Sequence, residues 1–302
     1  MFISSCLSTN EKGHLAIDGV DVLSLAESHG TPLYCMSEKE IRKNCRSFTE
    51  ALKSNYGEKA MAYYASKALN CKEILRIVGS ENMGVDVVSG GELYTARSVN
   101  FPAEKIIFHG NNKTAPELTE AVDYGVGTIV VDNIFELELL NGICMAKSVT
   151  QGIMLRIKPG VEAHTHKFVM TGSIDSKFGF ALENGEADEA VKAAVKLNNL
   201  KLIGIHCHIG SQIFEDEPFC EAARIMLRFL SKANKEYGAK ISRLNLGGGF
   251  GIKYLDDDMF SPVSDMIASV ARAIKDECAA LGIELPFVIL EPGRGIVGSA
   301  GI

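Results

Sequence analysis

The feature that most constrains the fold is an eightfold alternation of short apolar runs and helix-like stretches. Strands that alternate with helices in this way form parallel sheets, and eight such units close into a (β/α)8 barrel. We therefore predict an α/β protein in which one TIM-type barrel accounts for most of the chain. The apolar runs begin near Met61, Val85, Ile106, Thr128, Ile153, Leu202, Ile241 and Phe287.

A segment of different character precedes the barrel. Leu15–Val20 and Pro32–Met36 are predicted to be short strands on either side of a small helix at Val22–His29. We assign residues 1–36 to this preceding segment and residues 37–302 to the barrel.

Composition excludes several classes of protein. A net charge of −7 over 302 residues argues against a nucleic-acid-binding surface. No apolar stretch approaches the roughly 20 residues that a membrane span needs. The 8 cysteines are scattered without any CxxC pair, as expected for reduced thiols, and the first residues lack the pattern of a secretion signal. We expect a cytoplasmic protein that binds neither nucleic acid nor membrane.

Polar residues close the apolar runs, and in TIM-type barrels the carboxyl ends of the strands carry the active site. Lys67 follows the first run and is expected to point over the barrel mouth. If apolar groups and other cations surround this lysine, it loses its proton more readily, and a neutral amine can react with an aldehyde. The alternative is a solvated lysine at the edge of a loop. The residues that close the other runs are Asp86, His109, Asp132, Arg156, His208, Gly247 to Gly249 and Glu291.

Two loops near the end of the chain are suited to a phosphate group. LNLGGGFG places Gly247, Gly248 and Gly249 directly after the seventh run, where bare backbone amides can approach an anion. EPGRG follows the eighth run and adds the amide of Gly293 and the guanidinium of Arg294. The loops after strands seven and eight are a frequent phosphate site in these barrels. One lysine and two such loops on one rim indicate pyridoxal 5′-phosphate (PLP) as the cofactor.

Glu291 closes the eighth run and should lie near the same pocket. A carboxylate beside a pyridine nitrogen keeps that ring protonated, which deepens the electron sink of pyridoxal chemistry. An ion pair with Arg156 across the barrel is the alternative, and the cofactor role is favoured because a protonated ring nitrogen gives a buried acid its partner.

The motif HCHIGSQ allows two interpretations. His206 and His208 are two residues apart on a strand and could bind a metal, as in some barrel hydrolases. The eighth run offers a phosphate-type loop instead of further ligands, so no metal is predicted. We expect His208 to stack on the cofactor ring, Ser211 to bond its phosphate, and His206 to be a satisfied core histidine.

Taken together, the motifs resemble the diaminopimelate decarboxylase family from about Gly30 to the last residue. The shared segments are YYASKALN, GVDVVSGGEL, FHGNNKT, PGVEAHTHKFVMTG, DSKFGF, HCHIGSQ, LNLGGGFG and EPGR. The SKAL, GGGFG and EPGR elements also occur in related ornithine and arginine decarboxylases, so they identify the cofactor. HGNNKT and HTHKFVMTG are the segments that favour diaminopimelate as the substrate.

The resemblance implies PLP-dependent removal of carbon dioxide from meso-2,6-diaminopimelate, a small amino acid, to give L-lysine in a homodimeric enzyme. It implies catalytic roles for Lys67, which binds the cofactor covalently, for His208, which covers its ring, and for Glu291, which meets the ring nitrogen. The phosphate side is formed by Gly247, Gly248, Gly249, Ser211, Gly293 and Arg294. Asp86, Glu92 and Arg156 support the cofactor, and Arg294 is also expected to contact substrate.

The sequence departs from the family at its end, where it stops at GSAGI. Members of the family continue into a β domain that completes the active site in the dimer. The resemblance therefore implies that residues 1–36 are N-terminal strands of an incomplete β domain. We therefore expect a fragment that binds cofactor weakly and does not turn over alone. The alternatives are a non-catalytic PLP carrier barrel, a decarboxylase of another basic amino acid and, least favoured, a metal-dependent barrel hydrolase.

Overall fold

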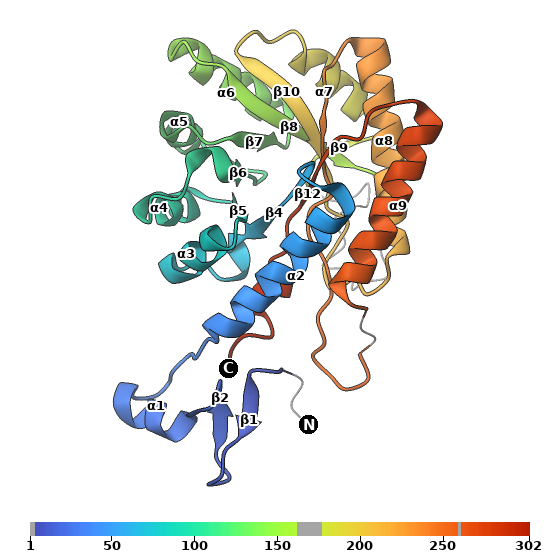
Figure 1. Ribbon diagram of the computed structural model, residues 1–302. Helices are drawn as coiled ribbons and strands as arrows, with labels where there is room; N and C mark the ends of the chain where they lie inside the picture. Colours follow the sequence, from blue (N-terminus) through green and yellow to red (C-terminus); the bar gives the residue numbers. More distant parts are fainter. Residues whose placement is uncertain (1–3, 162–176, 259–260) are drawn as a thin grey trace.

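A closed parallel barrel forms the body of the molecule (Figure 1). The computed structural model describes residues 4–161, 177–258 and 261–302. Within these residues, eight parallel strands pair side by side, and the pairing of the sixth strand with the fifth closes the ring. The strands are β4 (Ala60–Ala65), β5 (Gly84–Val87), β6 (Ile106–Phe108), β7 (Thr128–Val131), β8 (Gln151–Lys158), β10 (Leu200–His206), β11 (Arg243–Asn245) and β12 (Phe287–Leu290). The predicted (β/α)8 barrel is confirmed, and each strand begins within two residues of its expected start.

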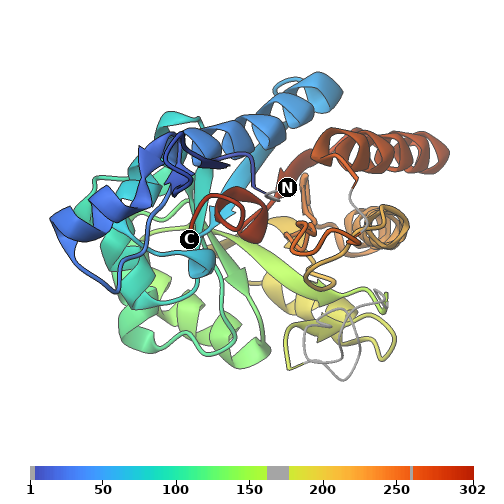
Figure 2. The same cartoon turned by 90° about the horizontal axis from the view of Figure 1, so that it is seen from below.

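Helices surround the strands, as the view from below shows (Figure 2). Several helices start where a short polar residue caps the first turn soon after a strand, which places the helix N-terminus at the same end as the strand tips. Ser89 accepts from the Glu92 amide at the start of α4, and Asn133 accepts from the Glu136 amide at the start of α6. The helices are α2 (Glu38–Tyr56), α3 (Lys72–Ser80), α4 (Gly90–Ser98), α5 (Ala115–Tyr124), α6 (Ile134–Ala146), α7 (Glu186–Ala194), α8 (Glu217–Tyr237), α9 (Val263–Leu281) and α10 (Arg294–Val297), with short 3-10 helices η1 (Ser66–Ala68) and η2 (Ala103–Lys105).

Two apolar clusters stabilise the barrel. The larger one lies between the strands and the surrounding helices, where each strand buries the side chains that point outward. The smaller cluster fills the barrel interior and consists of Tyr63, Ile107, Val130, Met154 and Ile289, each no more than 5% exposed. Because side chains fill the interior, the barrel is a packed core, and the polar residues at its mouth are the ones placed to act on a ligand.

The N-terminal segment forms a small antiparallel sheet outside the barrel. Its strands are β1 (Leu7–Thr9), β2 (Leu15–Ile17) and β3 (Val20–Asp21), and α1 (Val22–His29) follows as predicted. The predicted strand Leu15–Val20 is therefore two strands, because Asp18 and Gly19 both have positive φ and turn the chain back.

The predicted strand Pro32–Met36 is reduced to one antiparallel bridge, between Met36 and Gly301. Two backbone hydrogen bonds between Cys35 and Ile302, of 2.9 and 3.0 Å, hold the same pair of segments together. The segment before the barrel thus contacts the last residues of the chain, which lie beside α2 in Figure 1. Strand β9 (Phe180–Ala181) pairs with the last residues of β8. The segment HTHKFVMTG, which precedes β9 in the sequence, lies outside the described residues.

None of the helices in the described ranges has the length and apolar character needed to cross a membrane. All eight cysteines carry free thiols, six of them buried.

Candidate active site

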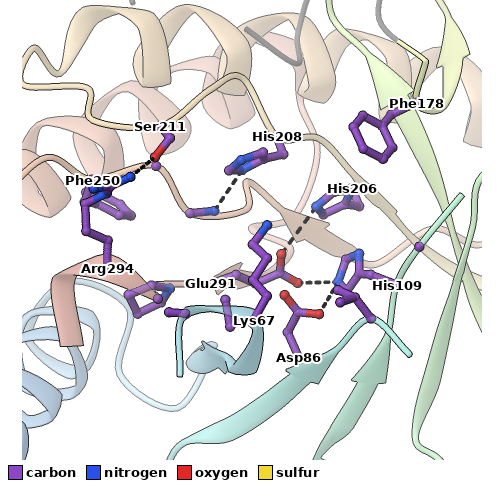
Figure 3. A pocket seen from close by; sticks show the side chains of 18 of the residues that line it. Lys67, Asp86, His109, Phe178, His206, His208, Ser211, Phe250, Glu291 and Arg294 are labelled. Carbon is purple, nitrogen blue, oxygen red and sulfur yellow. Dashed lines mark hydrogen bonds and ion pairs between the residues drawn. The ribbon is translucent and has the colours of Figure 1, made fainter. Parts of the chain in front are cut away.

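The polar ends of the strands surround a cavity of about 550 Å³ at the barrel mouth. Figure 3 shows Ser211 and Arg294 at one side of this cavity and Asp86, His109 and His206 at the other, with Lys67 and His208 between them. We call the first group the phosphate end and the second, which includes Glu291, the ring end. The predicted residues that line the cavity are Lys67, Asp86, Arg156, His208, Ser211, Gly248, Gly249, Glu291, Gly293 and Arg294. Gly247 lies directly behind this lining, against His208.

Lys67 lies on η1, the single turn that continues β4 into the mouth. The turn is fixed from below, because the buried Ser66 Oγ lies 2.8 Å from the Asp86 carbonyl oxygen and 2.6 Å from Glu92 Oε2. The same Glu92 oxygen accepts the Val88 amide at 2.9 Å. Lys67 itself is exposed, and its amine is presented to the cavity from the rim, as expected for a side chain over the barrel mouth.

Glu291 is the centre of the ring end. It follows β12, is 6% exposed, and its Oε1 accepts hydrogen bonds from His109 Nε2 at 2.7 Å and Asn245 Nδ2 at 2.6 Å. Its Oε2 lies 3.4 Å from His206 Nε2. The alternative partner, Arg156, instead approaches Asp132, with 3.9 Å between Nε and Oδ1.

Burial and hydrogen bonding set the charges at this end of the cavity. Burial alone would raise the pKa of Glu291, but the two histidines outweigh burial and hold that pKa well below its usual value. Burial lowers the pKa of His206 to about 3, so this imidazole is neutral at neutral pH and acts on Glu291 as a hydrogen-bond partner. Burial also raises the pKa of Asp86 to about 6, against the attraction of His109. Glu291 is therefore ionised throughout the neutral range, whereas Asp86 becomes ionised only as the pH rises through about 6.

The phosphate end is built from backbone amides and one arginine. The Arg294 guanidinium donates to Tyr254 Oη at 2.6 Å and to Ser211 Oγ at 3.3 Å. Its Nε is buried without a hydrogen-bond partner among the described residues. A Cβ added at Gly248 would collide with the Glu291 carbonyl oxygen, so only glycine allows this loop to lie against β12.

These features fit PLP. The Gly249 and Gly293 amides have no protein acceptor within the described part of the chain, and together with Ser211 and Arg294 they form a donor set for a phosphate group. The carboxylate that a pyridinium nitrogen requires lies at the opposite end of the same cavity. The Gly248 amide donates to His208 Nδ1 at 3.3 Å, which fixes the imidazole between the two ends.

One buried ion pair and one cation–π contact lie beside the ring end. Lys113 Nζ is 2.8 Å from Glu136 Oε1, and both side chains are no more than 3% exposed. The Arg156 guanidinium stacks 4.2 Å from the centre of the Phe178 ring. Burial lowers the pKa of both Lys113 and Arg156, although the carboxylates around them oppose this shift. Arg156 lines the cavity as predicted, whereas Lys113 supports the loop after β6 through the Gly110 carbonyl at 2.6 Å.

His206 differs from its predicted role. It lines the cavity, and its Nδ1 is buried without a hydrogen-bond partner among the described residues, so it is no satisfied core histidine. The potential metal ligands in the described chain are His109, His206 and Glu291, whose ligand atoms lie within 4.8 Å of one another. The pair expected for a metal, His206 and His208, is therefore not the set that the fold brings together.

Sequence reasoning missed Asn245 and gave His109 no role beyond a place on the rim. Both touch Glu291, from β11 and from the end of β6. Their position in the sequence could have identified them as site residues, because both lie at the carboxyl ends of strands, as Glu291 does.

Comparison with known proteins gives one consistent result. Residues 38–298 match the family described as pyridoxal-dependent decarboxylase, pyridoxal binding domain. The diaminopimelate decarboxylases of Bacillus methanolicus and Bacillus subtilis are each 44% identical to the chain over 301 residues, which are 100% of this chain and 69% and 68% of theirs.

Solved structures agree with the sequence comparison. The diaminopimelate decarboxylase of M. jannaschii in complex with L-lysine superposes with a TM-score of 0.89 at 37% identity, covering 100% of this chain and 69% of that one. The Helicobacter pylori enzyme with L-lysine gives a TM-score of 0.83 at 29% identity, covering 93% of this chain and 68% of that one. A barrel whose mouth fits PLP and whose sequence aligns along its whole length with the two Bacillus enzymes belongs to the diaminopimelate decarboxylase family.

Proposed function

We propose that this barrel carries out the PLP-dependent decarboxylation of meso-2,6-diaminopimelate to L-lysine, the last step of lysine biosynthesis. The observation that carries the proposal is the convergence of Lys67, Glu291 and the phosphate donors on one cavity. When bound, PLP supplies an electron sink for the pair of electrons released as carbon dioxide leaves.

The role that we assign to each residue follows from its position in the cavity. We assign covalent attachment of the cofactor to the Lys67 amine, and contact with the ring nitrogen to the Glu291 carboxylate, which stays ionised at neutral pH and so keeps a proton on that nitrogen. His208, held by the Gly248 amide, covers the ring. Asp86 and Arg156 support the ring end from β5 and β8.

At the phosphate end, Gly247, Gly248 and Gly249 form the loop that approaches the phosphate, and Ser211 and Gly293 donate to it. Arg294 neutralises its charge, and we assign a contact with the substrate to the same guanidinium. The amino-acid substrate itself enters beside Lys67, because that side chain lies at the open rim.

The metal alternative is disfavoured by the hydrogen bonds of Glu291. A metal ion held by His109 Nε2 would have to displace the 2.7 Å hydrogen bond between this nitrogen and Oε1. We also propose that residues 1–36 are part of a second, β-rich domain and that residues 37–302 are the PLP-binding domain. We further propose that the protein is a homodimer in the cytoplasm. The free thiols support a reducing compartment, and sedimentation of the protein with PLP tests the dimer.

The substrate assignment is tested by incubating the purified protein with PLP and measuring carbon dioxide release from meso-diaminopimelate, L-ornithine and L-arginine. Lysine formed from diaminopimelate alone supports the proposal. Faster release from ornithine or arginine would assign the barrel to another basic amino acid. A lysine-bound PLP absorption band that none of the three amino acids changes would identify a carrier.

A further inference from the structure

The two oxygens of Glu291 have unequal surroundings. Oε1 accepts the short hydrogen bonds from His109 and Asn245, whereas Oε2 has one longer approach, 3.4 Å from His206 Nε2. A carboxylate oxygen can accept two hydrogen bonds, so Oε1 is saturated and Oε2 retains capacity for a further donor.

The orientation of Asn245 is fixed by its second contact. Its Oδ1 accepts the Gly247 amide at 2.9 Å, so its Nδ2 is the atom that faces Glu291 and must donate. The side chain is fully buried at the end of β11, where the strand pairs on both sides. Asn245 therefore connects the phosphate-end glycine loop to the ring-end carboxylate through one rigid amide.

His109 is held with similar rigidity. It is 4% exposed, its backbone amide donates to the Val87 carbonyl at 2.8 Å, and its ring packs edge-on against His206 with 4.6 Å between centroids. Its Nε2 lies 2.7 Å from Glu291 Oε1 and 3.8 Å from Asp86 Oδ1. Because both neighbours are carboxylates, the proton of a neutral His109 ring belongs on Nε2, where it is donated to Glu291.

We infer that His109 and Asn245 are positioning residues that clamp Oε1 of Glu291 and present Oε2 to the ring nitrogen of bound PLP, so that the site selects a cofactor ring with an N–H group. This inference rests on the proposed function, because it assumes that the cavity binds PLP with its ring nitrogen at Glu291. Preset hydrogen bonds hold the acceptor in place before the ligand arrives, and so remove the cost of orienting it.

The test compares two cofactors in equilibrium binding, without any turnover. One is PLP, and the other is the analogue in which carbon replaces the ring nitrogen, so that both keep the aldehyde and the phosphate. The unmodified protein is expected to bind PLP roughly tenfold or more tightly, the ratio typical of one charge-assisted hydrogen bond. A ratio of one would overturn the inference, whereas failure to bind either molecule would overturn the proposed function.

Three variants separate positioning from general support. His109→Leu is expected to reduce the binding ratio by roughly threefold or more, since Oε1 loses one of its two donors. His109→Gln should restore most of the ratio, because an amide can also donate to the carboxylate. Thr128→Val is the matched control, because Thr128 is buried at the opposite end of the barrel strands and its loss should leave the ratio unchanged.

A merely structural role for His109 would weaken both cofactors equally, and an unchanged ratio in His109→Leu would overturn the inference. If that variant does not fold, Asn245→Asp provides the second measurement. The aspartate keeps the acceptor for the Gly247 amide and puts an oxygen against Glu291 in place of the donor. We expect its ratio to fall as well, and an unchanged ratio there would equally contradict the clamp.

Discussion

The two ends of the cavity differ in burial and in the kind of group that supplies their hydrogen bonds. At the ring end, Glu291, His109, His206 and Asn245 are each no more than 6% exposed and are bonded side chain to side chain. At the phosphate end, Ser211, Gly293 and Arg294 are only half-buried, and backbone amides supply much of the donor capacity. The ring end is a buried network of side-chain hydrogen bonds, whereas the phosphate end is a partly exposed set of backbone and side-chain donors.

The difference follows from what each end has to bind. A phosphate group carries its own charge and is recognised by any converging set of donors, so glycine loops suffice. A ring nitrogen is protonated only if its partner carboxylate stays ionised in a buried place, and that requires several donors around the carboxylate. Substitutions at the ring end should therefore damage chemistry, and substitutions at the phosphate end should damage affinity.

Lys67→Ala should have the largest effect, because Lys67 lies between the two ends and neither can replace it. We expect activity to fall on the order of 10³-fold or more, as for loss of a covalent catalytic residue. The absorption band of lysine-bound PLP should disappear, while the phosphate end retains weak affinity for the cofactor. Spectral titration checks both points, with Lys72→Ala, an exposed lysine on α3, as the control. An intact band in Lys67→Ala would identify another lysine as the anchor.

Glu291→Gln tests the ring end directly. The glutamine amide keeps the volume but loses the charge that holds a proton on the ring nitrogen. The turnover number should fall roughly 100-fold or more, as for other lost electrostatic contacts, while affinity for PLP changes less because the phosphate end is intact. Steady-state kinetics at saturating PLP measure this, with Glu284→Gln in the exposed loop before β12 as the control. A normal turnover number with weakened cofactor binding would make Glu291 an affinity residue and remove the contrast between the two ends.

The phosphate end was the more predictable from the sequence. Gly247 to Gly249 and the EPGR segment are contiguous motifs whose chemistry depends on backbone amides, so the residues and their function appear together in the chain. The barrel was predictable for a similar reason, because strand and helix periods alternate locally. The sequence predicts Leu15–Val20 as one strand, whereas the structure has two, because the turn at Asp18 depends on a non-glycine residue with positive φ.

The ring end was predictable only in part. The sequence predicts that Glu291 lies in the same pocket as Lys67, and it does, but its partners come from β6, β10 and β11, which are far apart in the sequence. Arg156 was the expected alternative on charge alone, although the barrel brings His109 and Asn245 closer. Which side chains meet across a barrel mouth depends on strand register, which motif reading does not supply.

Asp86→Asn should reveal the cost of keeping the ring end ionised. The folded-state pKa of Asp86 is about 6 against 3.8 for the free side chain, because burial disfavours its charge. The folded state therefore holds the proton more tightly, so its contribution to stability is present below pH 3.8 and is lost as the pH rises through about 6.

A shift of that size corresponds to about 3 kcal/mol. Without PLP, the asparagine variant should thus gain stability relative to the unmodified protein between pH 4 and pH 7. Urea denaturation at a series of pH values measures this gain, and Asp276→Asn on the surface of α9 should show none. A constant difference across the range would mean that Asp86 is paired well enough to stay charged without cost.

Arg294→Ala should have the smallest effect of the four and tests the phosphate end. The guanidinium contributes one charged donor beside Ser211, while the amides of Gly249 and Gly293 remain. We expect the dissociation constant for PLP to rise roughly 10- to 100-fold, which is about 1.5 to 3 kcal/mol, and the turnover number at saturating PLP to change little unless Arg294 also holds substrate. Arg272→Ala, an exposed arginine on α9, controls for the loss of a positive charge.

The kinetic response of Arg294→Ala separates the two assignments of this residue. A phosphate role raises the concentration of PLP needed for half-saturation and leaves the KM for diaminopimelate unchanged once PLP is saturating. A substrate role raises that KM as well, because the substrate loses a charged partner even when the cofactor is fully bound. The turnover number could instead fall as far as in Glu291→Gln while the affinity for PLP stays intact. The phosphate end would then contribute to the chemical step, and the division between the two ends would be wrong.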